Sequence, residues 1–508
     1  MITPCPHDSI FWQMKKRLLI IMAAVVVCAL GAFLYVQLTH GTSFPELLPA
    51  NTTIGYISFS TAFEDGPEAR ILLSERLNID WDKDAAPWIG DDAAVVFLKN
   101  VDDKEVVTPL ILAHTRSPDI ALATLKSYHN SSQEIKEKRT GTTSIYSTPS
   151  LHFAFIGTTV VVGATQNSVE AMLAAQAPLT SRLSKDSNFI EVHKGSTSPY
   201  FAYLQPGLIP KSGLNMLSNF AGLWPEWPFI EGVPAIGVNA WKEGGNWQGT
   251  SYVALNSILT LEPEHAYRAA LLSLVPSDTA FMLSGQDLPS QLNKLSMLQA
   301  KNAPAVAVLV RTFIQNYFGK TATEKILSLL LNKEFLLAQS PAGTLFAAQV
   351  PSSVNDASIA SLRDAFVKNA AQFTPTERVV TLRDDSTAAE LVPDPSRITV
   401  IQEPYEGTTI HGVLLGHTLG LFDAVIAGKW LVSDNIELVK NAIAVTRGKL
   451  SDDDFRDSSV YRESLQPILK NPELLGIAVL PKVVFSFSKR TFASHMETDF
   501  VVSLAMIK

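Results

Sequence analysis

The chain has 508 residues, of which 46% are hydrophobic and 18% are charged, and its formal net charge is −8. This length allows two or three domains with their own cores, because a single core rarely grows beyond about 250 residues. The acidic balance excludes the basic surface that nucleic acid requires, so we expect no nucleic-acid partner. The only cysteines are Cys5 and Cys28, which leaves the chain after residue 28 without disulfides or cysteine–metal sites.

The N-terminus has the pattern of a membrane anchor. Lys15, Lys16 and Arg17 precede LLIIMAAVVVCALGAFLYVQL, an uncharged run over residues 18–38. A run of this length can cross ~30 Å of hydrocarbon as a helix. We predict a single transmembrane helix over 18–38, with residues 1–17 in the cytoplasm and the main body outside, so the membrane is a predicted partner. A cleaved signal peptide is the alternative, but its apolar part usually spans only ~7–15 residues.

Further along, the order of landmarks in the first half is repeated in the second. LLPANTTIGYISFS (47–60) is answered by LVPSDTAFMLSGQD (274–287), each a proline turn followed by a period-2 strand. FIGTTVVVGATQNSVEAML (155–173) is answered by LFDAVIAGKWLVSDNIELVKNAI (421–443), each two strands across a tight turn running into a helix. The repetition predicts a tandem duplication.

The predicted organisation follows from this repetition. A first repeat is expected over 43–257 and a second over 258–508, with a polar, proline-bearing insertion at about 375–406. Alternating apolar and polar runs separated by helices, with short links between strands, favour antiparallel sheet covered by helices. The predicted fold class is therefore α+β, an N-terminal transmembrane helix followed by two tandem copies of an antiparallel-sheet-plus-helices unit.

Several stretches of the first copy resemble a known family. LLP before a strand, PWIGDDAAVVF, FAFIGTTVVVGATQNSVEAML and LSKDSNFIEV are similar to a bacterial family of membrane-anchored envelope proteins known only as a domain of unknown function. The resemblance covers most of residues 45–206 and, more weakly, 274–481. It implies an anchor in the bacterial inner (cytoplasmic) membrane and a main body that is periplasmic or extracellular. It implies no activity and no functional residues.

A serine acyl-transfer set is suggested by two motifs. SFSK (486–489) fits S-x-x-K, and SDN (433–435) fits the second element of penicillin-binding enzymes. The order is wrong, because the S-x-x-K serine should come first and at a helix start, whereas Ser486 lies in an alternating run near the end of the chain. Capping of a helix explains Asn435. We therefore predict no catalytic residues.

The strongest candidate for a metal site is the acidic stretch DWDKDAAPWIGDD (80–92). Asp80, Asp82, Asp84 and Asp91 fall at positions 1, 3, 5 and 12 of a calcium loop. Position 6 is Ala85 where glycine is needed, position 12 is aspartate in place of glutamate, and a strand follows in place of a helix. A solvated turn is the favoured interpretation, and no cofactor is predicted.

The aromatic loop LWPEWPFIEGVP (223–234) carries the partner-contact candidates. Trp224, Trp227 and Phe229 stand between prolines that prevent regular structure. Such rings pack into the core or form a contact surface. The predicted function is a membrane-tethered extracytoplasmic protein, a non-enzymatic binding or assembly module for an envelope protein or polymer. A hydrophobic-ligand carrier or sensor is the alternative, and a hydrolase with an unrecognised site comes third.

Overall fold

The computed structural model describes most of the chain after residue 43. The described residues are 44–60, 86–99, 107–127, 135–140, 143–148, 151–174, 176, 181–194, 198–209, 233–243, 245–255, 267, 269–290, 330, 332–384, 386–416, 419–449, 455–470, 472–480, 483–492 and 494–504. By its internal contacts the chain forms two compact units. The first comprises Met1–Thr260 with the short segment Ser494–Met496, and the second comprises Leu261–Ala493 with Glu497–Lys508.

The predicted α+β class with an N-terminal transmembrane helix is wrong. Antiparallel sheet dominates the described residues, and the longest described helix, α11 (Asp356–Ala370), has 15 residues. Within those residues no helix is long and apolar enough to cross a membrane, and the predicted span 18–38 lies outside them. The physical reason is that tight turns such as Gly157–Thr158 and Ala427–Gly428 join strands directly, so chain neighbours pair and strands predominate among the described residues.

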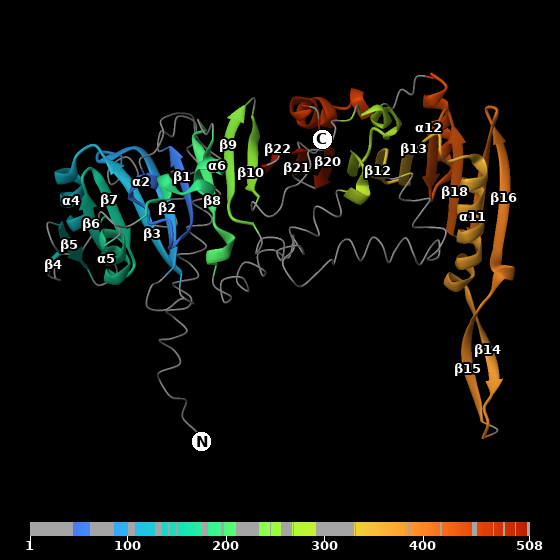
Figure 1. The fold of residues 1–508 in the computed structure, drawn as a ribbon, viewed down its shortest axis with the longest axis horizontal. Helices are drawn as coiled ribbons and strands as arrows, with labels where there is room; N and C mark the ends of the chain where they lie inside the picture. The colour runs from blue at the N-terminus through green and yellow to red at the C-terminus, as the bar shows by residue number, and fades with distance from the viewer. Residues whose placement is uncertain are drawn as a thin grey trace. The chain divides into compact units, whose positions relative to one another are not determined.

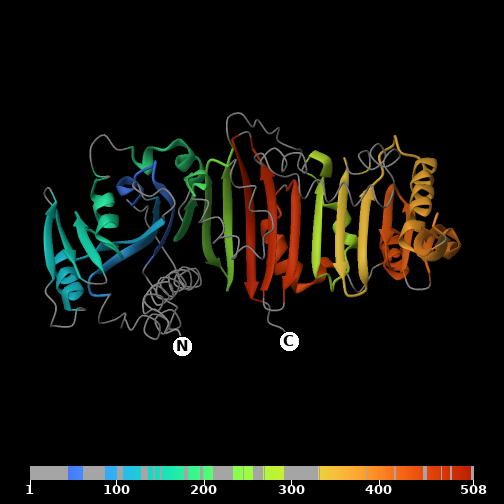
Figure 2. The same cartoon turned by 90° about the horizontal axis from the view of Figure 1, so that it is seen from below.

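The strands of the first unit form one antiparallel sheet in the order β4-β5-β6-β7-β3-β2-β1-β8-β9-β10 (Figures 1 and 2). Tyr56 of β1 fixes the central register, because it lies opposite Val96 of β2 and Tyr203 of β8. The strands are β1 (Thr53–Ser60), β2 (Ile89–Lys99), β3 (Val107–Thr115), β4 (Lys136–Thr140), β5 (Thr143–Ser147), β6 (His152–Ile156), β7 (Thr159–Gly163), β8 (Tyr200–Leu204), β9 (Ile236–Glu243) and β10 (Asn246–Ala254).

Helices bury both faces of this sheet. Val169 and Met172 of α5 and Phe189 of α6 pack with Val96 in one core, whereas Ala121 of α4 belongs to a separate core on the other face. The alternation of strand side chains explains how one strand serves two cores. The helices are α2 (Phe44–Leu47), α4 (Pro118–Ser127), α5 (Gln166–Ala174) and α6 (Ser187–His193), with the 3-10 turns η2 (Leu183–Lys185) and η3 (Pro206–Leu208).

The second unit repeats the strand order of the first. Its antiparallel pairs run β16-β17-β18-β19-β13-β12-β11-β20-β21, and each strand takes the place of its counterpart in the first unit. The strands are β11 (Phe281–Gln286), β12 (Glu334–Ser340), β13 (Gly343–Gln349), β16 (Ile398–Tyr405), β17 (Thr408–Leu415), β18 (Leu419–Ile426), β19 (Lys429–Ser433), β20 (Leu474–Leu480), β21 (Val483–Thr491) and β22 (His495–Leu504).

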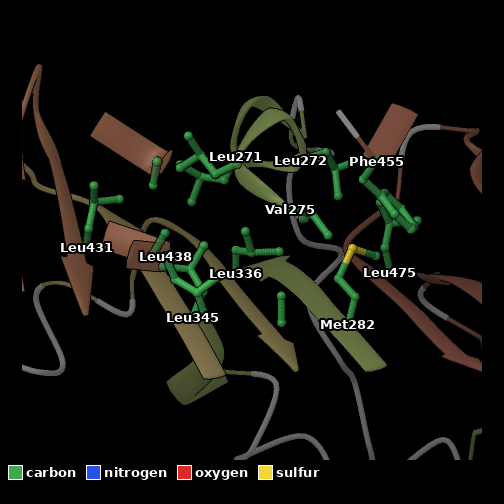
Figure 3. Packing of buried hydrophobic residues seen from close by; sticks show 14 of the residues in the cluster. Leu271, Leu272, Val275, Met282, Leu336, Leu345, Leu431, Leu438, Phe455 and Leu475 are labelled. Carbon is green, nitrogen blue, oxygen red and sulfur yellow. The ribbon is translucent and has the colours of Figure 1, made fainter. Parts of the chain in front are cut away.

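The main core of the second unit lies under α12 and the 3-10 turn η6. Leu271 and Leu272 of η6 and Leu438 of α12 pack on Leu336 and Leu345 of the sheet (Figure 3). On the opposite face α11 packs through residues that include Ile359 and Leu362. The helical elements besides α11 are η6 (Ala270–Leu274), η7 (Ala371–Phe373), η8 (Pro395–Arg397), α12 (Ile436–Thr446), η9 (Phe455–Asp457), the π-helix η10 (Tyr461–Leu465) and η11 (Gln466–Ile468).

The predicted insertion at about 375–406 contains the one pair of strands with no counterpart in the first unit. β14 (Pro375–Thr381) and β15 (Thr387–Pro393) form a separate two-stranded antiparallel sheet. The rest of the insertion includes β16, which belongs to the main sheet. Figure 1 shows β14 and β15 extending away from the sheet of the second unit. We call this hairpin, residues 375–393, the arm.

The shared strand order extends to an ion pair with exchanged charges. In the first unit Lys138 of β4 binds Glu170 of α5 at 2.7 Å. In the second unit Glu403 of β16 binds Lys440 of α12 at 2.9 Å. Glu170 and Lys440 are each the fifth residue of their helix. Lys138 and Glu403 each lie on the outermost strand of their sheet. The position is therefore kept as an ion pair while its polarity is reversed.

Candidate functional site

The predicted metal set falls mostly outside the described residues. Asp80, Asp82 and Asp84 are not among them, whereas Asp91 lies on β2 and forms an exposed ion pair with Arg116 at 2.9 Å. No group of three or more potential metal ligands occurs within the described part of the chain. The calcium interpretation stays a prediction.

The partner-contact candidates Trp224, Trp227 and Phe229 also lie outside the described residues. Their burial or exposure therefore stays a prediction.

The serine motifs have structural explanations. The side chain of Ser486 is completely buried on β21, so its hydroxyl cannot meet a substrate from solvent. Asn435 caps α12 by accepting the backbone N–H of Glu437 at 2.9 Å. The neighbouring Asp434 accepts the N–H of Thr344 at 2.8 Å. Asp434 and Asn435 therefore hold a strand start and a helix start, and Ser486 is out of reach of a substrate.

Among the described carboxyl groups, a buried glutamate of the second unit has a strongly raised pKa. Glu334 begins β12, is 3% exposed, and accepts the backbone N–H of Leu271 and the amide of Gln349, each at 2.8 Å. Burial raises the pKa of Glu334 to about 7, against the opposing effect of the backbone N–H groups of Leu271 and Ala270 and of the charge of Lys429. Burial likewise lowers the pKa of Lys429. Glu334 therefore holds the start of η6 on the sheet at some electrostatic cost.

The first unit has a carboxylate at the same place. Asp92 lies opposite Ser60 as Glu334 lies opposite Gln286, and the next strand contributes His114 in place of Gln349. Nδ1 of His114 lies 2.5 Å from Oδ1 of Asp92. The ring of His114 stacks on Phe44 of α2, with ring centroids 4.4 Å apart. The Asp92–His114 pair thus lies beside α2, as Glu334 and Gln349 lie beside η6.

These two pairs form the polar arrangement that both units share. In each unit the carboxylate lies near the start of one strand, β2 or β12, and its partner near the end of the next, β3 or β13. Both pairs lie beside the short helix that precedes the first strand of the unit, α2 or η6. The chemistry differs between the units, because one pair contains an imidazole and the other an amide. A reaction common to both units would need the same proton-transfer group in each. The arrangement therefore supports packing better than catalysis.

A second buried polar cluster lies beneath α11. Asp423 of β18 accepts the guanidinium of Arg363 through both carboxylate oxygens, at 2.7 and 2.8 Å, and the indole N–H of Trp430 at 3.0 Å. Burial lowers the pKa of His411, which faces the same cluster, and the charge of Arg363 lowers it further. The corresponding strand positions of the first unit carry Tyr146 rather than His411. The bidentate ion pair is satisfied internally and ties α11 to its sheet.

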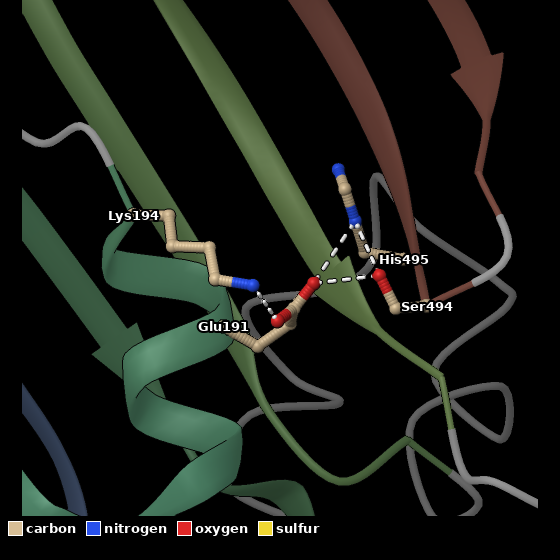
Figure 4. Close-up of polar contacts among 4 residues, drawn as sticks. All are labelled: Glu191, Lys194, Ser494 and His495. Carbon is tan, nitrogen blue, oxygen red and sulfur yellow. Dashed lines mark hydrogen bonds and ion pairs between the residues drawn. The ribbon is translucent and has the colours of Figure 1, made fainter.

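A third polar cluster resembles a catalytic triad at first sight (Figure 4). Ser494 donates its hydroxyl to Glu191 of α6 at 2.7 Å, and both contact Nδ1 of His495, at 3.1 and 3.2 Å respectively. Lys194 also binds Glu191, and its hydrogen bond is the largest cause of the lowered pKa of that carboxyl. A triad needs the serine and the carboxylate on different imidazole nitrogens, with the hydroxyl proton directed to the base. Here the hydroxyl proton points to the carboxylate, so the cluster fixes Ser494–Met496 to α6.

A shallow pocket lies beside the same helix. It has a volume of about 290 Å³ and is lined by Pro45, Glu46, Ser184, Phe189, Ile190, His193 and Lys194. This volume is at the lower limit for small-molecule sites, which usually measure ~300–1,000 Å³ and enclose their ligand. His193 stacks on Phe189 at 4.9 Å, and burial lowers the pKa of the imidazole. The pocket therefore gives little support to a hydrophobic-ligand carrier.

The arm carries the two most exposed large apolar side chains of the described residues. Leu391 and Val379 are 70% and 68% exposed, the highest values among the large apolar side chains of the described residues. Val379 lies opposite Ala389, and Glu377 lies opposite Leu391, so these four side chains share one face of the hairpin. The other face carries Arg378 opposite Glu390, between Val380 opposite Ala388 and Thr376 opposite Val392. Both faces thus mix apolar and polar side chains. We call the face of Val379, Ala389 and Leu391 the apolar face, because it carries the two most exposed apolar side chains.

The comparisons with known proteins identify the family. Residues 71–383, well over half of the chain, match the family described as "Protein of unknown function (DUF3352)". The chain belongs to the DUF3352 family. The predicted resemblance to a domain of unknown function is confirmed, and the match itself says nothing of anchoring or of the cell envelope. No curated protein matches this DUF3352 chain in sequence.

Two solved structures of a protein named TP0453 are similar to parts of this DUF3352 protein. Crystal form I is 13% identical and covers 43% of this chain and 80% of that chain, with a TM-score of 0.26. Crystal form IV is 11% identical and covers 42% of this chain and 83% of that chain, with a TM-score of 0.25. TM-scores this low carry no argument about fold or function.

Sequence reasoning missed both the shared carboxylates and the exposure of the arm. Asp92 and Glu334 differ in type, as do His114 and Gln349, so no common motif marks the pairs. Only the strand registers show that they correspond.

Proposed function

We propose that this DUF3352 protein is a non-enzymatic binding or assembly module that holds a protein partner by its arm. The proposal rests on the apolar face of the arm, where Val379 and Leu391 are largely exposed. A two-stranded hairpin is only marginally stable by itself in water. Large apolar side chains gathered on one exposed face are typical of contact surfaces.

The polar clusters support this proposal by their lack of a reactive arrangement. Glu334, Asp423 and Glu191 each accept hydrogen bonds that join a helix or strand end to its own sheet. Each cluster thus has a sufficient role in packing. The arm, by contrast, contributes no residue to the core under α12 or to the core under α11. The predicted location outside the cytoplasm and the predicted envelope partner remain proposals that accompany this one.

The test is photocrosslinking in living cells that express the full chain. A photoreactive phenylalanine analogue at position 391 is expected to give an adduct with one protein, because this side chain lies on the apolar face. The same analogue at position 388, on the other face of the same strand, is the matched control and is expected to give far less adduct.

Two further measurements decide the outcome. The adduct at position 391 should disappear when Val379→Lys is added to the same chain, and also when residues 375–393 are replaced by a short glycine–serine link. Such a link can close the gap because Pro375 and Pro393 are paired neighbours at the base of the arm. Equal adducts at 391 and 388, or adducts with polymer and no protein, would reject the proposal.

A further inference from the structure

The hydrogen-bonding pattern of the arm shows which backbone groups face outward. The N–H of Leu382 donates to the carbonyl of Ser386 at 2.7 Å, so these residues form a hydrogen-bonded pair at the tip. Bonded and non-bonded pairs alternate along antiparallel strands. The pairs Thr381–Thr387, Val379–Ala389 and Glu377–Leu391 are therefore non-bonded, and their N–H and C=O groups point away from the hairpin.

The two outer edges of the arm differ in charge. On β14 the outward residues are Glu377, Val379 and Thr381, and the charge of Glu377 protects that edge against an added strand. On β15 the outward residues are Thr387, Ala389 and Leu391, which are uncharged, and the one charged residue of that strand, Glu390, belongs to a bonded pair on the other face. Within the described part of the chain, β14 and β15 pair only with each other. The β15 edge is thus the better template for a further strand.

A second copy of the chain is a poor occupant of this surface. Seven residues of strand at ~3.4 Å each give a length of about 24 Å, and two strands give a width of about 10 Å. Face-to-face contact between two arms would cover about 240 Å² on each, whereas a standard interface buries about 800 Å² per partner. Strand addition gains main-chain hydrogen bonds as well as apolar contact, so it gives more affinity for the same length.

We infer that the arm binds its partner by β-strand addition at the β15 edge, and that the partner segment is an extended peptide with apolar residues opposite Ala389 and Leu391 and a basic residue opposite Glu390. This inference rests on the proposed function and specifies its partner. Residues opposite Ala389 and Leu391 lie on the apolar face and must be apolar. On the other face Glu390 has Arg378 on one side, and an opposite charge on its other side completes the row.

The added strand also explains the composition of the arm. Three strands with one apolar face form a stable sheet where two do not. Pro375 and Pro393 lie opposite each other at the base and lack N–H groups, so strand pairing ends there. The carbonyl of Pro375 accepts the side chain of Arg397 at 3.4 Å, which occupies the base of the β14 edge. The β15 edge from Thr387 to Val392 is left for the partner.

The test uses the purified full chain and a defined probe. A fluorescein-labelled nine-residue peptide that alternates valine with threonine and carries one central lysine is titrated with protein, and its anisotropy gives Kd. A second peptide carries glutamate in place of the lysine. We expect the lysine peptide to bind at least tenfold more tightly than the glutamate peptide.

Matched variants separate the two edges. Ala389→Pro removes an outward N–H from β15 and should weaken binding at least tenfold, whereas Glu377→Pro removes one from β14 and should leave Kd within twofold. Glu390→Lys should reverse the preference between the two peptides, and this variant keeps the test valid if the proline disturbs the hairpin. Normal binding by Ala389→Pro together with an unchanged preference in Glu390→Lys would overturn the inference.

The two proposals fail separately. A crosslinked protein at position 391 with no effect of Ala389→Pro on peptide binding would keep the arm as a contact surface and reject strand addition. Absence of the crosslink would reject the partner in cells, whatever the peptide shows.

Discussion

Glu334→Gln tests whether the buried carboxylate beneath η6 destabilises the second unit at neutral pH. The pKa of this carboxyl is about 7 in the folded protein against an ordinary value of 4.5. A carboxyl group with a raised folded-state pKa binds its proton more tightly when folded. The free energy of unfolding therefore falls as pH rises from about 4.5 to about 7 and is level above that. Because glutamine has no proton to lose, the variant should not show this decrease.

The magnitude follows from the difference in pKa. The gap between 4.5 and about 7, at ~1.4 kcal/mol for each pH unit, corresponds to about 3 kcal/mol. The free energy of unfolding of Glu334→Gln minus that of the wild type should thus rise by about 3 kcal/mol between pH 4 and pH 8. A constant offset from the changed hydrogen bonds to Leu271 and Gln349 would not alter this slope.

The assay must report on the second unit alone, because a chain with two units need not unfold in one step. Trp430 is buried and is the only tryptophan after residue 260, so its fluorine-19 resonance in fluorotryptophan-labelled protein can follow urea unfolding at each pH. Glu377→Gln, on the exposed arm, is the control and should keep the wild-type profile. Parallel profiles for Glu334→Gln and the wild type would refute the reasoning about the buried carboxyl.

Three further results are expected. Arg363→Met should lower the stability of the second unit by about 3 kcal/mol in the same urea assay, because it leaves Asp423 buried without its cation; an effect below 1 kcal/mol would mean that the ion pair contributes little. A double-mutant cycle on Lys138 and Glu170 should give a coupling of only ~0.2–1 kcal/mol, as for other exposed pairs, and a zero coupling would show that the contact is not maintained in solution. Gly237→Ala should lower the melting temperature of the first unit, because its Cβ would lie 2.6 Å from a backbone carbonyl oxygen of α6; an unchanged melting temperature would show that the helix can move away.

Local structure was predictable wherever alternation and turn residues agree. The stretch 155–173 forms two strands and a helix as predicted, with positive φ at Gly157 in the turn. Asn435 caps its helix because an Asn side chain can accept the first free N–H groups. The predicted fold class was wrong in the proportion of helix to sheet. Short helical patterns in the sequence count for less than strands, because the strands pair continuously across each unit.

The candidate site was predictable only in part, because its contacts depend on strand register. Nothing local to Asp92 indicates that His114 lies beside it, since 21 residues separate them and a bulge interrupts the strand between Ile89 and Ala93. Likewise the polar run 375–393 indicated a surface excursion, but its separation from the main sheet depends on which strands pair.

The reversed ion pairs have a consequence for synthesis of the chain. Two units with the same strand order in one polypeptide can exchange helices while they fold, a characteristic failure of proteins built from similar units. If α12 took the place of α5, Lys440 would meet Lys138, and in the opposite exchange Glu170 would meet Glu403. Each wrong assembly places like charges together, whereas each correct one neutralises them. Opposite polarity at one shared position thus disfavours the helix of the other unit, by about the small energy of one exposed ion pair.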